Sequence, residues 1–249
     1  MKILYSLCMA LILLMGGCDR KQEVTSQGTP LMVGVSADNR PFEYYQEGKM
    51  VGFDIDLIRL VAARLGRPLV LKDMSFDGLL GALQSHSIDL AISAMTPTED
   101  RIKAVDMTQK YHEAKTELVC LKTSPITSLE DVRGLVLGVQ QGSTHEQFAK
   151  QELVGPFKVT LKSLNKVPEL IQEIRIGRIS CLIIGHGEAR AIAEEMPELK
   201  TVPIDRNSTG GEAIALPKGS NLTAPINEVL TELKKEGTLQ KLARQWLKE

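Results

Sequence analysis

The stretch Ile88-Asp89-Leu90-Ala91-Ile92-Ser93-Ala94-Met95-Thr96-Pro97-Thr98-Glu99-Asp100-Arg101 decides the fold of this chain. Its apolar first part predicts a buried strand. Small and hydroxyl residues up to Pro97 then predict a turn, and Thr98 followed by two acids is typical of a helix start. Arg101 falls in the first turn of that helix. Ligands of open α/β sheets bind beyond the carboxyl ends of the strands, so this turn is a candidate ligand site.

Two interpretations of Arg101 are open from the residues alone. A turn with free backbone N–H groups and hydroxyls, beside a planar guanidinium, suits a small carboxylate. Alternatively, Arg101 is a solvated helix residue that pairs with Glu99 or Asp100.

The turn also carries a family resemblance, together with three other stretches in the same order along the chain. The four stretches are Thr96–Arg101, Pro41–Tyr44 with Val51–Leu57, Val139–Thr144 and Ile214–Gly219. They resemble the bacterial extracellular solute-binding proteins of family 3, the polar amino-acid binding subunits of ABC transporters. The match extends from Leu31 to Leu247.

The resemblance implies a two-lobe α/β fold, that of type II periplasmic binding proteins, often called a Venus flytrap. Lobe 1 would comprise residues 31–113 and 212–249, and lobe 2 residues 118–210. Two crossing strands near 114–117 and 211–212 would form the hinge. The ligand would lie in the cleft, and closure of the lobes would bury it.

Composition and the N-terminal residues narrow the class further. The 249 residues are 43% hydrophobic and 24% charged with a net charge of −1, so we expect no nucleic-acid partner. The apolar run Ile3–Met15 is too short to span a membrane, which takes about 20 residues, and fits a signal peptide. It ends in Gly16-Gly17-Cys18, which resembles a lipoprotein cleavage box. We therefore expect a leader at 1–17, lipid on Cys18 and a flexible tether at 18–30.

An ordinary signal peptide, cut nearby, is the alternative interpretation of this leader. In either case the protein is exported, and the lipid would anchor it in the cell envelope, facing the periplasm or the cell exterior. We expect the protein to be a monomer.

From Leu31 onward, strand and helix signals alternate, which predicts an α/β class with parallel βαβ units. The predicted strands are 31–35, 69–71, 88–93, 117–121, 135–139, 159–161, 181–184, 201–202 and 213–216. The predicted helices are 53–65, 76–83, 144–151, 168–176, 188–195, 222–235 and 239–247.

Two cysteines, Cys120 and Cys181, stand in apolar strand-like runs. They are either buried free thiols or, in an exported protein, a disulfide; the sequence does not place them together. The histidines form no metal-ligand cluster, and Gly142-Ser143-Thr144 is too short for a phosphate-binding loop. We expect no metal and no cofactor.

The resemblance assigns a role to several residues of lobe 1. Arg101 would take the ligand α-carboxylate as a bidentate pair, and the Thr96 hydroxyl would contact the same group. Ser93 would offer its carbonyl to the ligand ammonium, and Ala94 holds a place often occupied by glycine. Phe76 would stack on the ligand side chain, although a core role for Phe76 is equally compatible with the pattern.

Lobe 2 would complete the carboxylate site. The turn Gly142-Ser143-Thr144 matches a family turn whose backbone N–H groups and hydroxyl bind the carboxylate at a helix start. Gln141, just before it, is a further candidate, and Gln140 and Gln141 are also typical of strand-end hydrogen bonders.

Two positions depart from the family pattern. Asn39 replaces an aromatic residue, and Gly185 replaces the acid that usually pairs with the ligand ammonium. A buried ammonium without a carboxylate partner is costly. We expect Glu188 to supply that carboxylate; the other accounts are Asp38, a ligand without an α-ammonium, and Glu188 as a solvated helix acid.

Three functions compete. The first is a lipid-anchored binding subunit that captures an amino acid or a related carboxylate and delivers it to a membrane permease, without catalysis. The second is an enzyme of the cyclohexadienyl dehydratase type on the same fold, with His186 or Glu188 as its acid. The third is a sensor or interaction lobe that no longer binds a ligand. The intact carboxylate half of the site favours the first.

Overall fold

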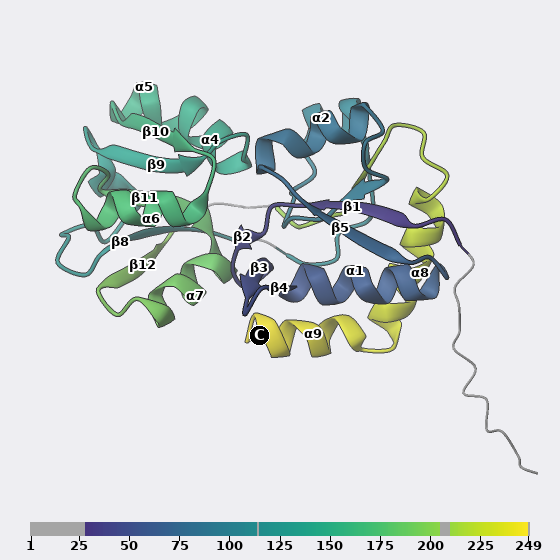
Figure 1. Cartoon of the computed structure of the whole chain (residues 1–249). Coiled ribbons are helices and arrows are strands. Elements are labelled where there is room, and N and C mark those ends of the chain that lie inside the picture. Colours follow the sequence, from purple (N-terminus) through teal and green to yellow (C-terminus); the bar gives the residue numbers. More distant parts are fainter. Residues whose placement is uncertain (1–27, 114, 205–209, 249) are drawn as a thin grey trace, which may run out of the picture.

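The computed structural model describes residues 28–113, 115–204 and 210–248. Two α/β lobes lie side by side and each has its own five-stranded sheet (Figure 1). The two-lobe α/β prediction is therefore confirmed. The predicted leader 1–17, Cys18 and most of the tether lie outside the described residues.

The sheet of the first lobe has the order β5-β1-β6-β13-β7. Its strands are β1 (Leu31–Val35), β5 (Leu69–Asp73), β6 (Leu90–Ala91), β7 (Asp106–Met107) and β13 (Ala215–Leu216). Its helices are α1 (Phe53–Arg64), α2 (Leu79–Gln84) after the 3₁₀ turn Phe76–Gly78, α3 (Glu99–Ala104), α8 (Thr223–Lys235) and α9 (Thr238–Trp246).

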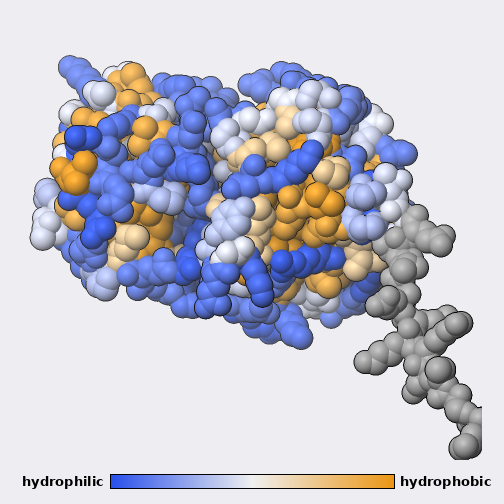
Figure 2. Space-filling view, viewed as in Figure 1, coloured by the Kyte–Doolittle hydropathy of each residue, from blue (hydrophilic) through white to orange (hydrophobic). Residues whose placement is uncertain are grey.

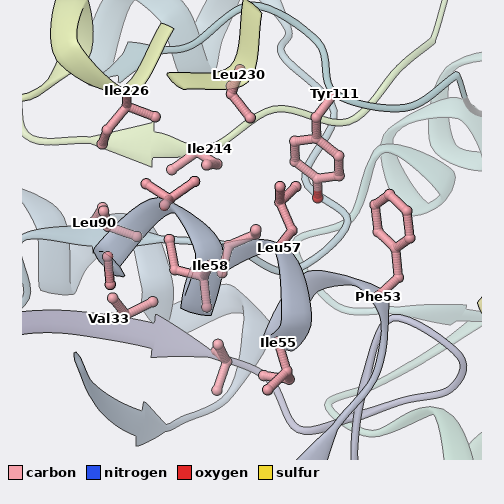
Figure 3. Close-up of a cluster of buried hydrophobic side chains, with 14 of the residues drawn as sticks. Val33, Phe53, Ile55, Leu57, Ile58, Leu90, Tyr111, Ile214, Ile226 and Leu230 are labelled. Carbon is pink, nitrogen blue, oxygen red and sulfur yellow. The ribbon is translucent and has the colours of Figure 1, made fainter. Parts of the chain in front are cut away.

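Apolar side chains fill both faces of this sheet. On one face α1, α8 and α9 pack against β1, β6 and β13, and Figure 3 shows Ile55 and Ile58 of α1 together with Val33, Leu90 and Ile214. On the other face α2 and the 3₁₀ turn pack against β6 and β13. The carboxyl end of β6 is thereby held at the edge of the lobe, where the turn to Arg101 begins.

The second lobe has the strand order β10-β9-β11-β8-β12. Its strands are β8 (Thr116–Leu121), β9 (Val136–Gln140), β10 (Thr160–Leu164), β11 (Cys181–Gly185) and β12 (Leu199–Pro203). One face is covered by α6 (Val167–Arg175) and α7 (His186–Glu195). The other is covered by the 3₁₀ helix η2 (Leu129–Val132), by α4 (Thr144–Phe148) and by the π-helical segment η3 (Ala149–Leu153), which leads into α5 (Val154–Phe157).

Strand directions correct the expectation of parallel units. β13 runs antiparallel to β6 and β7, and β8 runs antiparallel to β11 and β12. Both β13 and β8 enter their sheets directly from the connections between the lobes, without the helical crossover that imposes a parallel direction. The strand predicted at 88–93 is also shorter, and a small sheet that the sequence did not reveal joins β2 (Asp38–Asn39), β3 (Glu43–Gln46) and β4 (Lys49–Val51).

The two connections between the lobes pair with each other. An isolated antiparallel bridge links His112 and Glu212, with Glu212 N–H donating to the His112 carbonyl over 2.8 Å.

Hydrophilic residues dominate the face seen in Figure 2, and its largest apolar area lies on the first lobe. Within the described ranges, no helix has both the length and the apolar character that a membrane crossing requires.

Candidate functional site

A cavity of about 820 Å³ lies between the lobes, within the size range of small-molecule sites. Ten of the eleven residues predicted for the site line it: Asn39, Phe76, Ser93, Ala94, Thr96, Arg101, Ser143, Thr144, Gly185 and Glu188. The exception is Gln141, whose side chain is exposed and donates to Asp77 Oδ2 across the lobes over 3.2 Å. Its neighbour Gln140 lines the cavity instead.

Arg101 is fixed by the start of α3. The Thr98 hydroxyl accepts a hydrogen bond from Arg101 N–H at 3.2 Å, which is the predicted helix cap. The guanidinium then donates from Nη1 to the Thr96 carbonyl at 2.7 Å and from Nη2 to the Gly142 carbonyl of the other lobe at 3.0 Å. It lies over the Phe76 ring, 5.4 Å from its centroid.

The charge on Arg101 is buried but not neutralised. The residue is only 7% exposed, and burial alone lowers the pKa of its guanidinium to about 10, with no carboxylate of the described residues opposing that shift. Asp100 pairs with Lys103 instead. The alternative of a solvated arginine paired with a neighbouring acid is therefore wrong. Two of the five guanidinium N–H groups have acceptors among the residues that the structure describes, which leaves donors for an anion.

The turn before Arg101 depends on two buried carboxylates of the first lobe. Ala94 adopts φ +44°, a left-handed conformation, which explains why glycine suits this position. Ala94 N–H donates to Asp54 Oδ2 over 2.7 Å, and the Ser93 hydroxyl donates to Glu43 Oε1 over 2.5 Å. Burial raises the pKa of both carboxyl groups, that of Asp54 to about 6. These two acids thus hold the turn in place through hydrogen bonds to Ala94 and Ser93.

Lobe 2 presents the start of α4 to the cavity. The Ser143 hydroxyl caps this helix by accepting from Glu146 N–H over 3.1 Å. Gly142 N–H donates to Glu146 Oε2 and Ser143 N–H to the Gln140 carbonyl, so these two N–H groups already have acceptors within the lobe. Binding of a carboxylate by this turn stays a prediction, and it now rests mainly on Thr144, which lines the cavity.

His145 is a site residue that the sequence did not reveal. It lines the cavity near Arg101, and burial together with the charge of Arg101 lowers its pKa to about 4. Its imidazole is therefore neutral at pH 7, so it adds no positive charge that would compete with Arg101 for an anion. A single histidine after a turn gives no pattern by which sequence reasoning would select it.

Glu188 occupies the space of the side chain that Gly185 lacks. A Cβ atom built on Gly185 would lie 2.3 Å from Glu188 Oε2 and 3.0 Å from its Cδ. Glu188 is 6% exposed and lines the cavity, so the alternative of a solvated helix acid is wrong. Burial raises the pKa of its carboxyl group. Asp38, the other acid considered, is not among the residues that line the cavity.

The second departure from the pattern, Asn39, is part of the same arrangement. Asn39 Nδ2 donates to Glu188 Oε1 over 3.3 Å, from one lobe to the other. A phenylalanine at position 39 would have no such donor. Glu188, held by Asn39, thus places its carboxyl group in the space that a side chain at position 185 would fill.

Glu212 adds a second carboxyl group beside Glu188. It comes from the connection between the lobes, and its Oε2 lies 3.0 Å from His112 Nδ1. Burial raises its pKa to about 8, although His112 opposes the shift. The sequence indicated only a lobe boundary here. The cavity therefore has a buried cation in Arg101 and buried carboxyl groups in Glu188 and Glu212.

Comparison with known proteins shows which family has this architecture. The family model described as bacterial extracellular solute-binding proteins, family 3, matches residues 31–249. An arginine-binding extracellular protein of Bacillus subtilis (strain 168) is 37% identical over 218 residues, covering 87% of this chain and 85% of that protein.

Solved structures agree. An ancestral arginine-binding protein bound to arginine has a TM-score of 0.83 and 39% identity, covering 89% of this chain and 99% of its own. An ancestral amino acid-binding protein described as a precursor of cyclohexadienyl dehydratase has a TM-score of 0.81 and 31% identity, covering 90% of this chain and 98% of its own. The two-lobe architecture, the family model and these relatives agree, and the chain belongs to the bacterial extracellular solute-binding proteins, family 3.

Proposed function

We propose that this protein is the substrate-binding subunit of an ABC importer. It captures a polar amino acid between its lobes and delivers it to a membrane permease. The observation that carries the proposal is that one cavity holds a buried guanidinium, Arg101, which no carboxylate of the described residues neutralises, and a buried carboxyl group, Glu188. An α-amino acid zwitterion carries the complementary pair.

The roles in this proposal follow the geometry. Arg101, with the Thr96 and Thr144 hydroxyls, binds the α-carboxylate. Glu188, held by Asn39, binds the α-ammonium, and the Ser93 carbonyl adds an acceptor for it. Phe76, which lies under Arg101 and also belongs to the core of the first lobe, contacts the ligand side chain. The arginine bound by relatives supports a ligand with a polar side chain.

Thermal unfolding against a panel of ligands tests the function. The panel contains amino acids, dipeptides and dicarboxylates. A ligand present at about 100 times its dissociation constant stabilises the folded state by about 2.7 kcal/mol. We expect this shift with one or a few α-amino acids. A shift only with carboxylates that lack an amino group would contradict the role of Glu188.

Closure of the lobes leads to a prediction about Gly142. Its φ is +74°, and a Cβ atom there would lie 3.0 Å from Cβ and 3.2 Å from Cα of Asp77 in the other lobe. Gly142→Ala should therefore weaken ligand binding by about tenfold or more, because one clash of about 1.4 kcal/mol in the closed state costs that factor.

Gly134→Ala is the matched control. Gly134 lies in the same lobe at φ +72°, with no atom within 4 Å of an added Cβ. Both variants should lose similar stability from backbone strain, and only Gly142→Ala should lose affinity in isothermal titration calorimetry. Equal affinities of the two variants would show that this contact does not limit closure.

The dehydratase alternative receives less support. The relative described as a precursor of that enzyme is itself described as an amino acid-binding protein. Turnover of prephenate or arogenate by the purified protein would favour this alternative over simple binding.

Lipid attachment at Cys18 completes the proposal. A lipidated Cys18 would hold the binding lobes at the membrane surface, close to a permease, through the polar segment 19–30. The mass of the mature N-terminal peptide tests this: an acylated Cys18 supports the anchor, and an unmodified N-terminus at another residue rejects it.

A further inference from the structure

Two cysteines of the second lobe lie directly opposite each other. Cys120 of β8 and Cys181 of β11 are register partners in an antiparallel pair that continues without interruption to Thr116 and Gly185. Both side chains are 0% exposed and belong to the same apolar core, on one face of the sheet. The sequence separates them by 60 residues and gave no indication that they meet.

The hydrogen-bond pattern tells which kind of pair they form. His186 N–H donates to the Lys115 carbonyl over 2.8 Å, so His186 and Lys115 are a hydrogen-bonded pair of the same ladder. Hydrogen-bonded and non-hydrogen-bonded pairs alternate along an antiparallel ladder. Cys181 and Cys120 are five pairs further on and therefore form a non-hydrogen-bonded pair.

This kind of pair suits a disulfide. The Cα atoms of a non-hydrogen-bonded pair are about 4.5 Å apart, and disulfides bridge Cα atoms about 4.4–6.8 Å apart. In the structure both cysteines are free, buried thiols. The neighbouring Cys181 thiol, with a smaller contribution from the charge of Lys200 on β12, lowers the pKa of the Cys120 thiol.

We propose that Cys120 and Cys181 form a disulfide in the exported protein, which fastens β11 to β8 within the second lobe. The family is extracellular, and extracellular compartments are oxidising. The oxidant is a disulfide, either of glutathione or of a protein. The two thiols lose two protons and two electrons and form one S–S bond, while the oxidant is reduced to two thiols.

Burial determines when the bond forms. Both sulfur atoms are inaccessible in the folded lobe, so exchange with the oxidant takes place before the helices close over the sheet. Once formed, the bond fixes the register of β11, which ends at Gly185 just before Glu188 of the cavity. The proposal thus concerns the lobe that carries the site, and it does not depend on the identity of the ligand.

Refolding in a glutathione buffer tests the bond. The full chain is unfolded and reduced, refolded with reduced and oxidised glutathione, then denatured again and alkylated without reduction before peptide mapping by mass spectrometry. We expect the peptides of Cys120 and Cys181 to be linked, with both thiols protected from alkylation. Alkylation of both thiols in the unreduced sample would overturn the proposal.

Variants provide the control and a second readout. In Cys120→Ala, Cys181 should be alkylated without reduction, since its partner is gone. The oxidised protein should melt roughly 10 °C above the reduced protein, because the bond closes a long loop. This difference should vanish in Cys120→Ala/Cys181→Ala. Equal melting of oxidised and reduced wild type would overturn the fastening role.

Discussion

Replacing Arg101 with alanine is expected to lower the affinity for amino acids by at least about 100-fold. Hydrogen bonds between charged groups contribute about 1.5–3 kcal/mol each, and a guanidinium makes two of them to a carboxylate. The cavity excludes most water from Arg101, so no solvent contact replaces them. Isothermal titration calorimetry of wild type and variant measures the loss.

The stability of the ligand-free variant provides the control. Burial lowers the pKa of Arg101, which means that the folded state disfavours its charge. Removing that charge should offset part of the cost of losing the hydrogen bonds to the Thr96 and Gly142 carbonyls, so we expect the variant to stay folded at pH 7 with a modest change in the free energy of unfolding. Arg101→Lys keeps a charge but loses the planar fork, so it should bind more weakly than wild type. Wild-type affinity in Arg101→Ala would refute the assignment of the carboxylate site.

Local signals made the Arg101 end of the site predictable from the sequence. The apolar run, the Pro97 turn and the Thr98 cap are read over a few neighbouring residues, and the structure has β6, a turn and α3 in that order. Helix positions elsewhere were predicted for the same reason. The mixed strand directions were not, because they depend on how the chain crosses between lobes.

Such local signals do not predict contacts between residues that are far apart in the sequence. Asn39 and Glu188 are 149 positions apart, so the sequence ranked Glu188 among several acids without showing what holds it. Gln140 and Gln141 illustrate a different limit. Gln140 is the last residue of β9 and Gln141 begins the turn after it, so the exact end of the strand decides which of the two enters the cavity. The structure assigns this place to Gln140.

The second large effect on affinity is expected at Glu188, the carboxyl group that shares the cavity with Arg101. Glu188→Gln should lower the affinity for α-amino acids by about 30-fold, the loss of one charged hydrogen bond of about 2 kcal/mol. The glutamine amide oxygen still accepts from Asn39, so the position of the side chain is kept. Binding of the same ligands without their amino group should not change. Equal affinity of wild type and variant for amino acids would refute the role of Glu188.

Moving the carboxylate back to position 185 provides a sharper test. Gly185 has φ −66° and ψ 156°, an extended conformation that any residue adopts, and the atoms nearest to a new Cβ there all belong to the Glu188 carboxyl group, with Oε2 at 2.3 Å. The single change should bring two buried carboxylates together and weaken both stability and binding. Glu188→Ala alone should lose the ammonium site.

The double variant Gly185→Asp/Glu188→Ala should then recover binding to within about tenfold of wild type, and the cycle of four proteins measures the coupling of the two positions by calorimetry. Recovery means that the cavity needs one carboxylate at this point, whichever residue supplies it. Failure of the double variant, with its fold intact, would mean that Glu188 acts through its contact with Asn39 across the lobes. In that case closure, more than charge, would be what Glu188 contributes.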